Sequence, residues 1–198
     1  MKAKKLFLLA LMLMVVFTFA ACGGSSEPAD SAEPAASDAP TVETDFPEGT
    51  FILMNGTEVR VGDNMANLEG KLGEETQPAE TIEPCDPNID LTTVQYFFNG
   101  VQITTNEEGV ISDISLDIRN GETDSSFGGK VKIGDSIDGV KEILGEPEEG
   151  NEDDMFITYY FGPEEDTSMV MVYKDEAGNN TMDGIILSKG SITMAQQN

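Results

Sequence analysis

The order of apolar and polar residues divides the chain into three regions. An apolar run without a charged residue covers residues 6–20, a segment with almost no large apolar side chain covers residues 23–46, and alternation of apolar and polar residues begins at Phe51. A period of two is typical of strands that bury one side, and a period near 3.6 is typical of amphipathic helices. The third region therefore contains the folded part of the chain.

The folded region opens with a predicted hairpin and a predicted helix. Asn55-Gly56 lies between the apolar stretches of residues 51–61 and favours a type I′ turn. Apolar residues within residues 63–72 then recur at the spacing of one helical face, and Gly73 follows them. We expect a hairpin over the first of these ranges and a short amphipathic helix over the second.

Residues 59–74 have a second copy at residues 131–146. The two segments align without a gap at an offset of 72, and six of the sixteen positions are identical. In the second copy Asp135 or Ser136 is placed to cap a helix, and Gly145 is placed to end it in a left-handed conformation. The sequence therefore contains an internal repeat, with one predicted helix in each copy.

Each copy continues as predicted strands. The aromatic residues 96–98 match residues 159–161 at an offset of 63, and alternation of apolar with polar residues follows in both copies. Such alternation is typical of an antiparallel sheet with one solvated face. Since a lone unit of about 60 residues is only marginally stable, the two units should share a sheet. We predict an α+β fold of two tandem helix-plus-antiparallel-strands repeats that share a sheet, with the helices on one face.

The N-terminal residues have the features of a secretion signal. Three lysines precede the apolar run of residues 6–20, which is short for a membrane-spanning helix and typical of a signal peptide. Residues 19–23, Phe-Ala-Ala-Cys-Gly, resemble the lipobox of bacterial lipoproteins. The resemblance implies transfer of diacylglycerol to the Cys22 sulfur and cleavage between Ala21 and Cys22. The alternative is an ordinary secretory signal with an incidental cysteine.

A tether and two repeats complete the predicted organisation. The segment after Cys22 is rich in Gly, Ser, Ala, Pro and acidic residues and contains no Lys or Arg, so it should be disordered. Acyl chains on Cys22 would hold the protein on the extracytoplasmic face of the cell membrane. The predicted divisions are a signal peptide (1–21), a lipid tether (22–46), a first repeat (47–122) and a second repeat (123–198).

Composition excludes several functions. The chain carries 37 Asp and Glu against 11 Lys and Arg, a formal charge of −26, which opposes binding to nucleic acid. It has no His, so imidazole bases, His-containing triads and His-bearing metal sites are absent. No nucleophile elbow, phosphate-binding loop or dinucleotide fingerprint occurs. We therefore predict that the protein is not an enzyme and has no cofactor beyond the lipid on Cys22.

The repeated motif carries a family resemblance. The positions that match the motif are Gly62, Asp63, Leu68, Leu72 and Gly73 in the first copy, and Gly134, Asp135, Ser136, Val140, Leu144, Gly145 and Pro147 in the second. With the aromatic strand that follows, the pattern resembles the tandem repeats of β-lactamase-inhibitor-protein-like (BLIP-like) domains. It is also similar to the related SmpA/OmlA lipoproteins, which carry one such unit. The stretch from Cys85 to Leu144 resembles a set of Firmicutes lipoproteins. The resemblance implies a two-layer α+β fold whose open sheet face docks another protein.

Four aromatic residues are candidate partner-binding residues. Tyr96, Phe98, Tyr159 and Phe161 alternate along their strands and should share one sheet face, with their neighbours on the other. Helices cover only one face, so one aromatic set could line the uncovered face as a docking surface. The alternative is that all of them pack in the core.

Acidic residues gather after the second predicted helix. The six residues are Glu146, Glu148, Glu149, Glu152, Asp153 and Asp154. Glu74, Glu75, Glu80 and Glu83 occupy the matching loop of the first copy. One hypothesis is that both loops form a single rim that attracts a basic partner or weakly binds Ca²⁺ or Mg²⁺. The alternative is a solvated acidic loop.

The loop around Cys85 is a weaker candidate. With Cys22 acylated, Cys85 has no partner in the chain, so it would be a free or intermolecular thiol, or a small residue packed under the loop. Asp86, Asn88 and Asp90 have the spacing of the first calcium-loop ligands, but the later ligands of an EF-hand are missing.

Together these features lead to two functional hypotheses. The first is a membrane-anchored lipoprotein whose domain binds another extracytoplasmic protein, as an inhibitor, adaptor or assembly factor. The second is a cell-envelope protein that captures cations or a small cationic or wall-derived ligand at the acidic rim. A flat aromatic face would favour the first, and a closed pocket the second.

Overall fold

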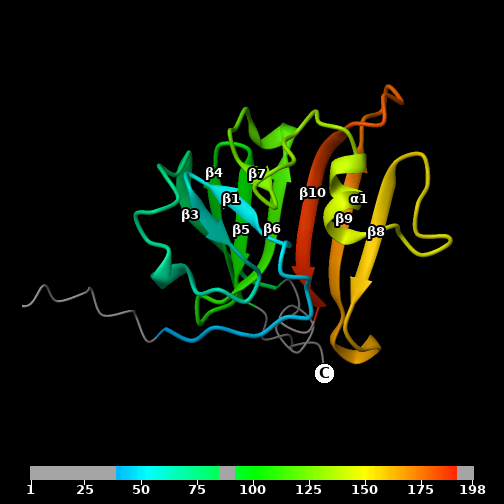
Figure 1. Cartoon of the computed structure of the whole chain (residues 1–198). Coiled ribbons are helices and arrows are strands. Elements are labelled where there is room, and N and C mark those ends of the chain that lie inside the picture. The colour runs from blue at the N-terminus through cyan, green and yellow to red at the C-terminus, as the bar shows by residue number, and fades with distance from the viewer. Residues whose placement is uncertain (1–38, 85–91, 191–198) are drawn as a thin grey trace, which may run out of the picture. The chain divides into compact units, whose positions relative to one another are not determined.

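The computed structural model describes residues 39–84 and 92–190, which form one compact unit built mainly from two antiparallel sheets (Figure 1). The larger sheet contains, in spatial order, β3 (Gln77–Ile82), β4 (Thr93–Phe98), β5 (Val101–Thr105), β6 (Ile111–Asp117), β10 (Met182–Lys189), β9 (Ser168–Lys174) and β8 (Phe156–Phe161). The smaller sheet contains β2 (Thr57–Val59), β1 (Ile52–Met54) and β7 (Ser126–Phe127).

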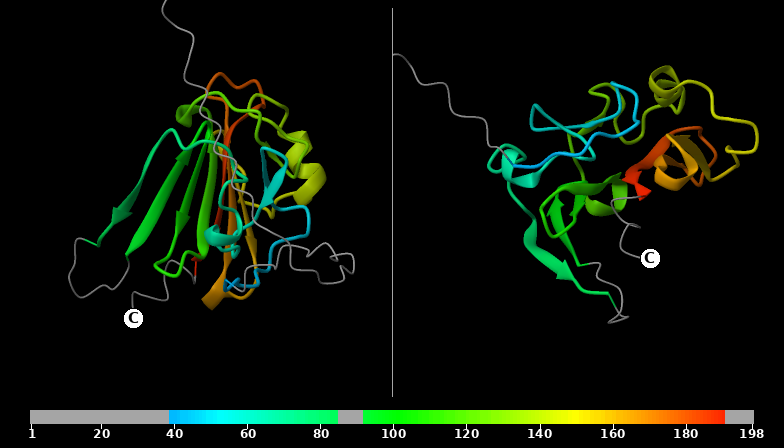
Figure 2. Two further views of the ribbon diagram at one scale, coloured as in Figure 1. Left: turned by 90° about the vertical axis from the view of Figure 1, so that its left-hand side faces the viewer. Right: turned by 90° about the horizontal axis from the view of Figure 1, so that it is seen from below.

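Helices contribute little to this fold. Within the described ranges, α1 (Asp138–Leu144) is the only α-helix, and the rest are 3-10 turns: η1 (Met65–Asn67), η2 (Ile118–Asn120) and η3 (Glu164–Asp166). The smaller sheet and α1 lie on the same face of the seven-stranded sheet (Figure 2). The prediction of an α+β fold with helices on one face was therefore wrong, because the fold is mainly β and a small sheet supplies much of the covering layer.

The predicted hairpin is confirmed in detail. β1 and β2 pair with Ile52 opposite Val59, and the turn between them has Asn55 at φ 47° and Gly56 at φ 79°. Both central residues of a type I′ turn need positive φ angles, which asparagine and glycine tolerate best.

The predicted helix over residues 63–72 is reduced to the 3-10 turn η1. The Asn64 side chain accepts a hydrogen bond from the Ala66 N–H at 3.0 Å and starts the turn. Gly70 has a φ of 72° and stands where the second copy has Glu142, in the interior of α1. A glycine inside a helix costs about 1 kcal/mol relative to alanine, and a left-handed residue ends the helical hydrogen-bond ladder. The helix therefore forms only in the second copy.

The two halves are related by an approximate twofold axis between β6 and β10. Residues 111–117 correspond to residues 182–188 at an offset of 71. Leu116 lies opposite Ile185, and Ile114 lies opposite Leu187. At this offset Leu116 corresponds to Leu187 and Ile114 corresponds to Ile185, so the two pairs are equivalent. Each half thus adds its meander on its own side of the axis, β4 and β5 on one side and β8 and β9 on the other.

The repeated Gly-Asp dipeptide attaches the covering layer to the sheet in the same way in both halves. The Gly62 N–H donates to the Ile111 carbonyl at 2.8 Å, and the Ile111 N–H donates to the Asp63 carbonyl at 2.8 Å. In the second half, Gly134 and Met182 make the first of these bonds at 2.8 Å, and Met182 and Asp135 make the second at 2.9 Å. The internal repeat therefore corresponds to a repeated backbone connection.

The N-terminal segment joins the domain earlier than the predicted tether boundary at residue 46. The Val42 N–H donates to the Gly62 carbonyl at 2.8 Å, and the ring of Phe46 packs edge-on against Phe161 with 5.8 Å between centroids. Asp45 forms an ion pair at 3.4 Å with Lys189, whose side chain is only 3% exposed. Residues 42–46 are thus part of the packed unit.

Candidate functional site

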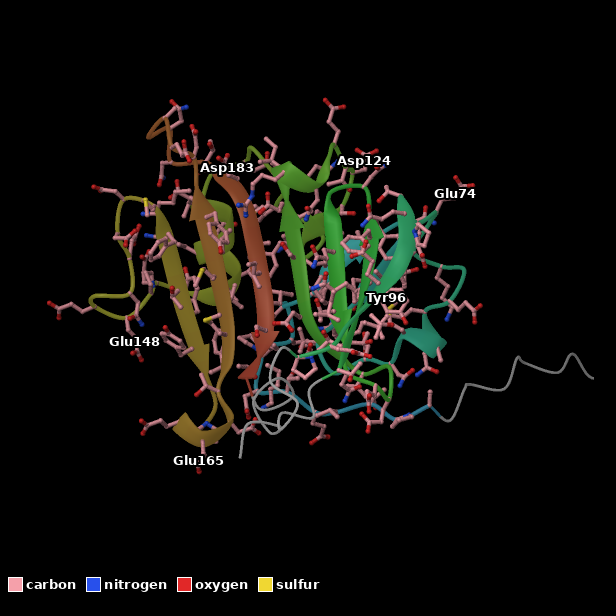
Figure 3. All side chains as sticks on the ribbon, turned by 180° about the vertical axis from the view of Figure 1, so that it is seen from behind. Glu74, Tyr96, Asp124, Glu148, Glu165 and Asp183 are labelled. Atoms are coloured by element: carbon pink, nitrogen blue, oxygen red, sulfur yellow. The ribbon has the colours of Figure 1, made fainter. Side chains whose placement is uncertain are left out.

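One face of the seven-stranded sheet carries no covering layer among the described residues. Figure 3 views the molecule from behind and shows the seven strands with no helix or second sheet in front of them. On this face, β8, β9 and β10 carry a group of apolar and aromatic side chains, which we call the face patch. Its members are Phe156, Tyr160, Met169, Met171, Tyr173 and Ile186. Tyr160 is 58% exposed, and the other five are half-buried. The patch is the candidate docking site.

The other half of the same face is more polar. Gln95 and Thr104 lie opposite each other on β4 and β5, and Gln102 lies opposite both Phe97 and Ser115 on its two neighbouring strands. Of these residues, all except Phe97 occupy positions that the twofold axis relates to the face patch. Phe97 and Ile82, which is 41% exposed, are apolar residues of this half, so the second half carries more of the apolar side chains of this face but not all of them.

A groove continues from the face patch toward the turn that connects β8 and β9. It has a volume of about 610 Å³, and its lining includes Tyr160 and Met169 from the strands and Glu164 and Glu165 from the turn. An apolar surface bordered by carboxylates favours a partner that presents apolar groups beside basic ones.

Charged groups also border the face patch at its opposite end. The Arg119 guanidinium donates to the Asp117 carboxylate and lies 5.7 Å from the centroid of the Tyr173 ring. Burial raises the pKa of Asp117, but the hydrogen bonds and charge of Arg119 outweigh it and hold that pKa below its usual value. Burial, followed by the charges of Asp175 and other acidic neighbours, raises the pKa of Asp183.

The four aromatic residues proposed as partner-binding residues share one sheet face, but it is the covered face. Phe98 is 7% exposed and Tyr159 is 5% exposed, both within the core between the layers. Tyr96 and Phe161 are half-buried against that core. The Tyr159 and Phe161 rings stack with 6.5 Å between centroids. Their neighbour Tyr160 lies on the uncovered face instead, because successive side chains of a strand point to opposite sides.

The acidic loop after α1 is held by lysines. Glu152 accepts from Lys141 at 3.0 Å and from Lys174 at 2.8 Å, and these bonds, Lys174 first, lower its pKa. Glu146 forms an ion pair with Lys141 at 3.3 Å. Asp153 accepts from the backbone N–H groups at the start of β8, which lowers its pKa. Glu148, Glu149 and Asp154 are exposed.

The two acidic loops do not form a single rim. Figure 3 places Glu74 and Glu148 at opposite sides of the sheet, beside its two edge strands β3 and β8. The cause is the twofold relation of the halves, which carries equivalent loops to opposite sides. In the described ranges, no three or more Cys, Asp or Glu side chains are arranged to hold a metal ion.

A second concave site lies on the covered side, in the first half. We call this cavity the first-half pocket. It has a volume of about 420 Å³ and lies between the η1 segment and β4. Tyr96 and Phe98 line it from β4, and Leu72 and the turn glycines Gly70 and Gly73 line it from the segment that follows η1. Sequence analysis missed this pocket, although Gly70, an interruption of the repeated helix pattern, was a signal for it.

Several sequence-based candidates lie outside the described residues. They are the lipobox residues Ala21 and Cys22, and the loop residues Cys85, Asp86, Asn88 and Asp90. Among residues 39–84 and 92–190, no helix has the length and apolar character needed to cross a membrane. The chain matches no protein-family model, no curated protein and no solved structure.

Proposed function

We propose that this protein is a lipid-anchored module that docks another extracytoplasmic protein on the uncovered face of its sheet. The partner is a folded protein with an apolar surface bordered by Lys and Arg. The anchor is the acylated sulfur of Cys22, as its resemblance to a lipobox residue implies.

The face patch is the observation that carries this proposal. Its tyrosines and methionines belong to the residue types enriched at protein interfaces, where aromatic anchors supply large contact areas. Tyr160 is the most exposed member and lies opposite Met169, so a partner side chain would contact both. Because strand pairing fixes the backbone of β8 and β9, the patch would bind without costly rearrangement.

Charge supports a basic partner. The chain has a formal charge of −26, and removal of residues 1–21 would take away three lysines and no acid. Glu164 and Glu165 lie in the groove beside Tyr160, where a basic rim would contact them. Association should therefore be accelerated by electrostatic steering and slowed by salt.

Site-specific photocrosslinking in the native cells tests the proposal. A photoreactive phenylalanine at position 160 should give one protein adduct, and the same residue at Gln95, on the polar half of the face, should give none. The partner identified by mass spectrometry should bind the purified chain, and the Tyr160→Ala/Met169→Ala variant should weaken that binding at least about tenfold. A Gln95→Ala/Gln102→Ala variant is the matched control.

Three results would contradict the proposal. Equal adducts from both positions would show that the crosslinks are not specific to the patch. Unchanged affinity of the patch variant would remove the patch as the docking site. A Cys22→Ser chain that stays in the membrane fraction as wild type does would remove the proposed anchor.

A further inference from the structure

We infer that the first-half pocket is a binding site for a small organic cation, an amine or quaternary ammonium with an apolar body. This site goes beyond the docking of a protein on the uncovered face. It lies on the opposite side of the sheet, since Tyr96 and Phe98 point to the covered face.

A comparison of equivalent positions shows why a pocket exists here. In the second half, α1 packs over β8, and the Tyr159 hydroxyl donates to the carbonyl of Gly145, the residue that ends α1, at 3.2 Å. In the first half, Tyr96 and Gly73 match Tyr159 and Gly145 in the sequence repeat, but both line an open cavity. The first half lacks the helix, so the space between the turn and the aromatic strand stays open.

The pocket is lined by apolar and by acidic side chains. Phe98 and Leu72 are each 7% exposed and form part of its apolar wall, with the ring of Tyr96 beside them. Three exposed carboxylates, those of Glu69, Glu75 and Glu108, are also among its lining residues. None of the described residues that line it is Lys or Arg.

This combination selects a cation with apolar substituents. Aromatic rings attract a cation through the negative charge of their faces, and organic ammonium groups lose less hydration energy than metal ions when they enter such a site. The carboxylates attract positive charge and repel anions. The volume of about 420 Å³ falls in the range of roughly 300–1,000 Å³ that is usual for small-molecule pockets.

Binding is tested on the full-length mature chain with methyl-labelled methionine. Met65 lines the pocket, so its methyl resonance reports occupancy, and Met171 on the opposite face is an internal control. The probes are choline, benzyltrimethylammonium and 3,3-dimethylbutan-1-ol, which is an uncharged isostere of choline. Both cations should shift the Met65 resonance in a saturable way, and the alcohol should bind about tenfold more weakly than choline.

Matched variants separate the pocket from the general negative charge. Glu75→Gln and Glu74→Gln remove the same charge from adjacent exposed residues, but only Glu75 lines the pocket. The first variant should weaken cation binding severalfold, and the second should leave it nearly unchanged. Tyr96→Phe should keep binding because it keeps the ring, whereas Tyr96→Leu should lose it.

The inference fails if neither cation gives a saturable Met65 shift at millimolar concentration, or if the alcohol binds as tightly as choline. It also fails if Glu75→Gln and Glu74→Gln behave alike. None of these results depends on the face patch, and the photocrosslinking of position 160 does not depend on the pocket.

Discussion

The two halves of the domain use one sequence pattern in two ways. Both attach their Gly-Asp turn to the sheet through the same pair of backbone hydrogen bonds, at Gly62 and at Gly134. Within the described residues, only the second half then forms an α-helix, and the first half has a pocket between its turn and its aromatic strand. The comparison shows that the backbone connection, rather than the helix, is the shared structural element.

The difference places two tyrosines that match in the sequence repeat in different surroundings. Tyr159 is buried and hydrogen-bonded to Gly145, which closes the second half. Tyr96 is half-buried and lines a cavity. The Tyr96 side chain is thus accessible from a cavity, whereas the Tyr159 side chain is enclosed in the core.

The largest effect is expected at the twofold axis, where the halves should not differ. Leu116 and Leu187 are equivalent at the offset of 71, and both are fully buried. We predict that Leu116→Ala and Leu187→Ala each lower the free energy of unfolding by about 2–5 kcal/mol. Urea unfolding followed by circular dichroism should show one cooperative transition for each variant, because one core serves both halves. A second transition in either variant would mean that the halves unfold separately.

Local features of the fold were predictable from the sequence. Asn55-Gly56 is a residue pair that favours a type I′ turn. The alternation of Ile114 and Leu116 with polar residues identifies a strand with one buried side. These features depend on neighbouring residues only. β3 was missed, because its residues are exposed along the whole strand, include Pro78 and show no apolar alternation.

The arrangement of the halves could not be predicted. The antiparallel pairing of β6 with β10 depends on contacts between distant residues, so the sequence alone did not indicate a twofold axis. Because the axis could not be foreseen, the two acidic loops were predicted to form one rim. The axis in fact places them at opposite sides of the sheet. The alternation of side chains along a strand predicted that Tyr96 and Tyr159 lie on the same sheet face. Which face is covered depends on where β1 and β7 pack.

A smaller effect is expected where the halves diverge. Gly70 has a φ of 72°, and no atom lies within 4 Å of the place that a Cβ would take, so Gly70→Ala should cost about 1–2 kcal/mol from backbone strain alone. Gly70→Asn should cost less, since asparagine tolerates this conformation. Glu142→Gly, the equivalent change inside α1, should cost about 1 kcal/mol through helix propensity. Thermal unfolding measures the stability of each variant, and far-ultraviolet circular dichroism measures its helical signal.

This prediction has a clear opposite. If Gly70→Ala raised both the stability and the helical signal, the first half would be able to form the missing helix. The difference between the halves would then depend on one residue, and the pocket should close in that variant.

The smallest effect separates the two tyrosines that match in the sequence repeat. Tyr159→Phe should cost about 1 kcal/mol at neutral pH because it removes the hydrogen bond to Gly145, while Tyr96→Phe should cost close to nothing. Burial raises the pKa of Tyr159 from 10.0 to about 12, and it outweighs the nearby charge of Lys141, which lowers that pKa. The folded state thus favours the neutral hydroxyl. Its contribution to the free energy of unfolding is complete below about pH 10 and is lost as the pH rises to about 12. The stability difference between wild type and Tyr159→Phe should therefore shrink over that interval, and a difference that stays constant from pH 8 to pH 12 would contradict the burial of this hydroxyl.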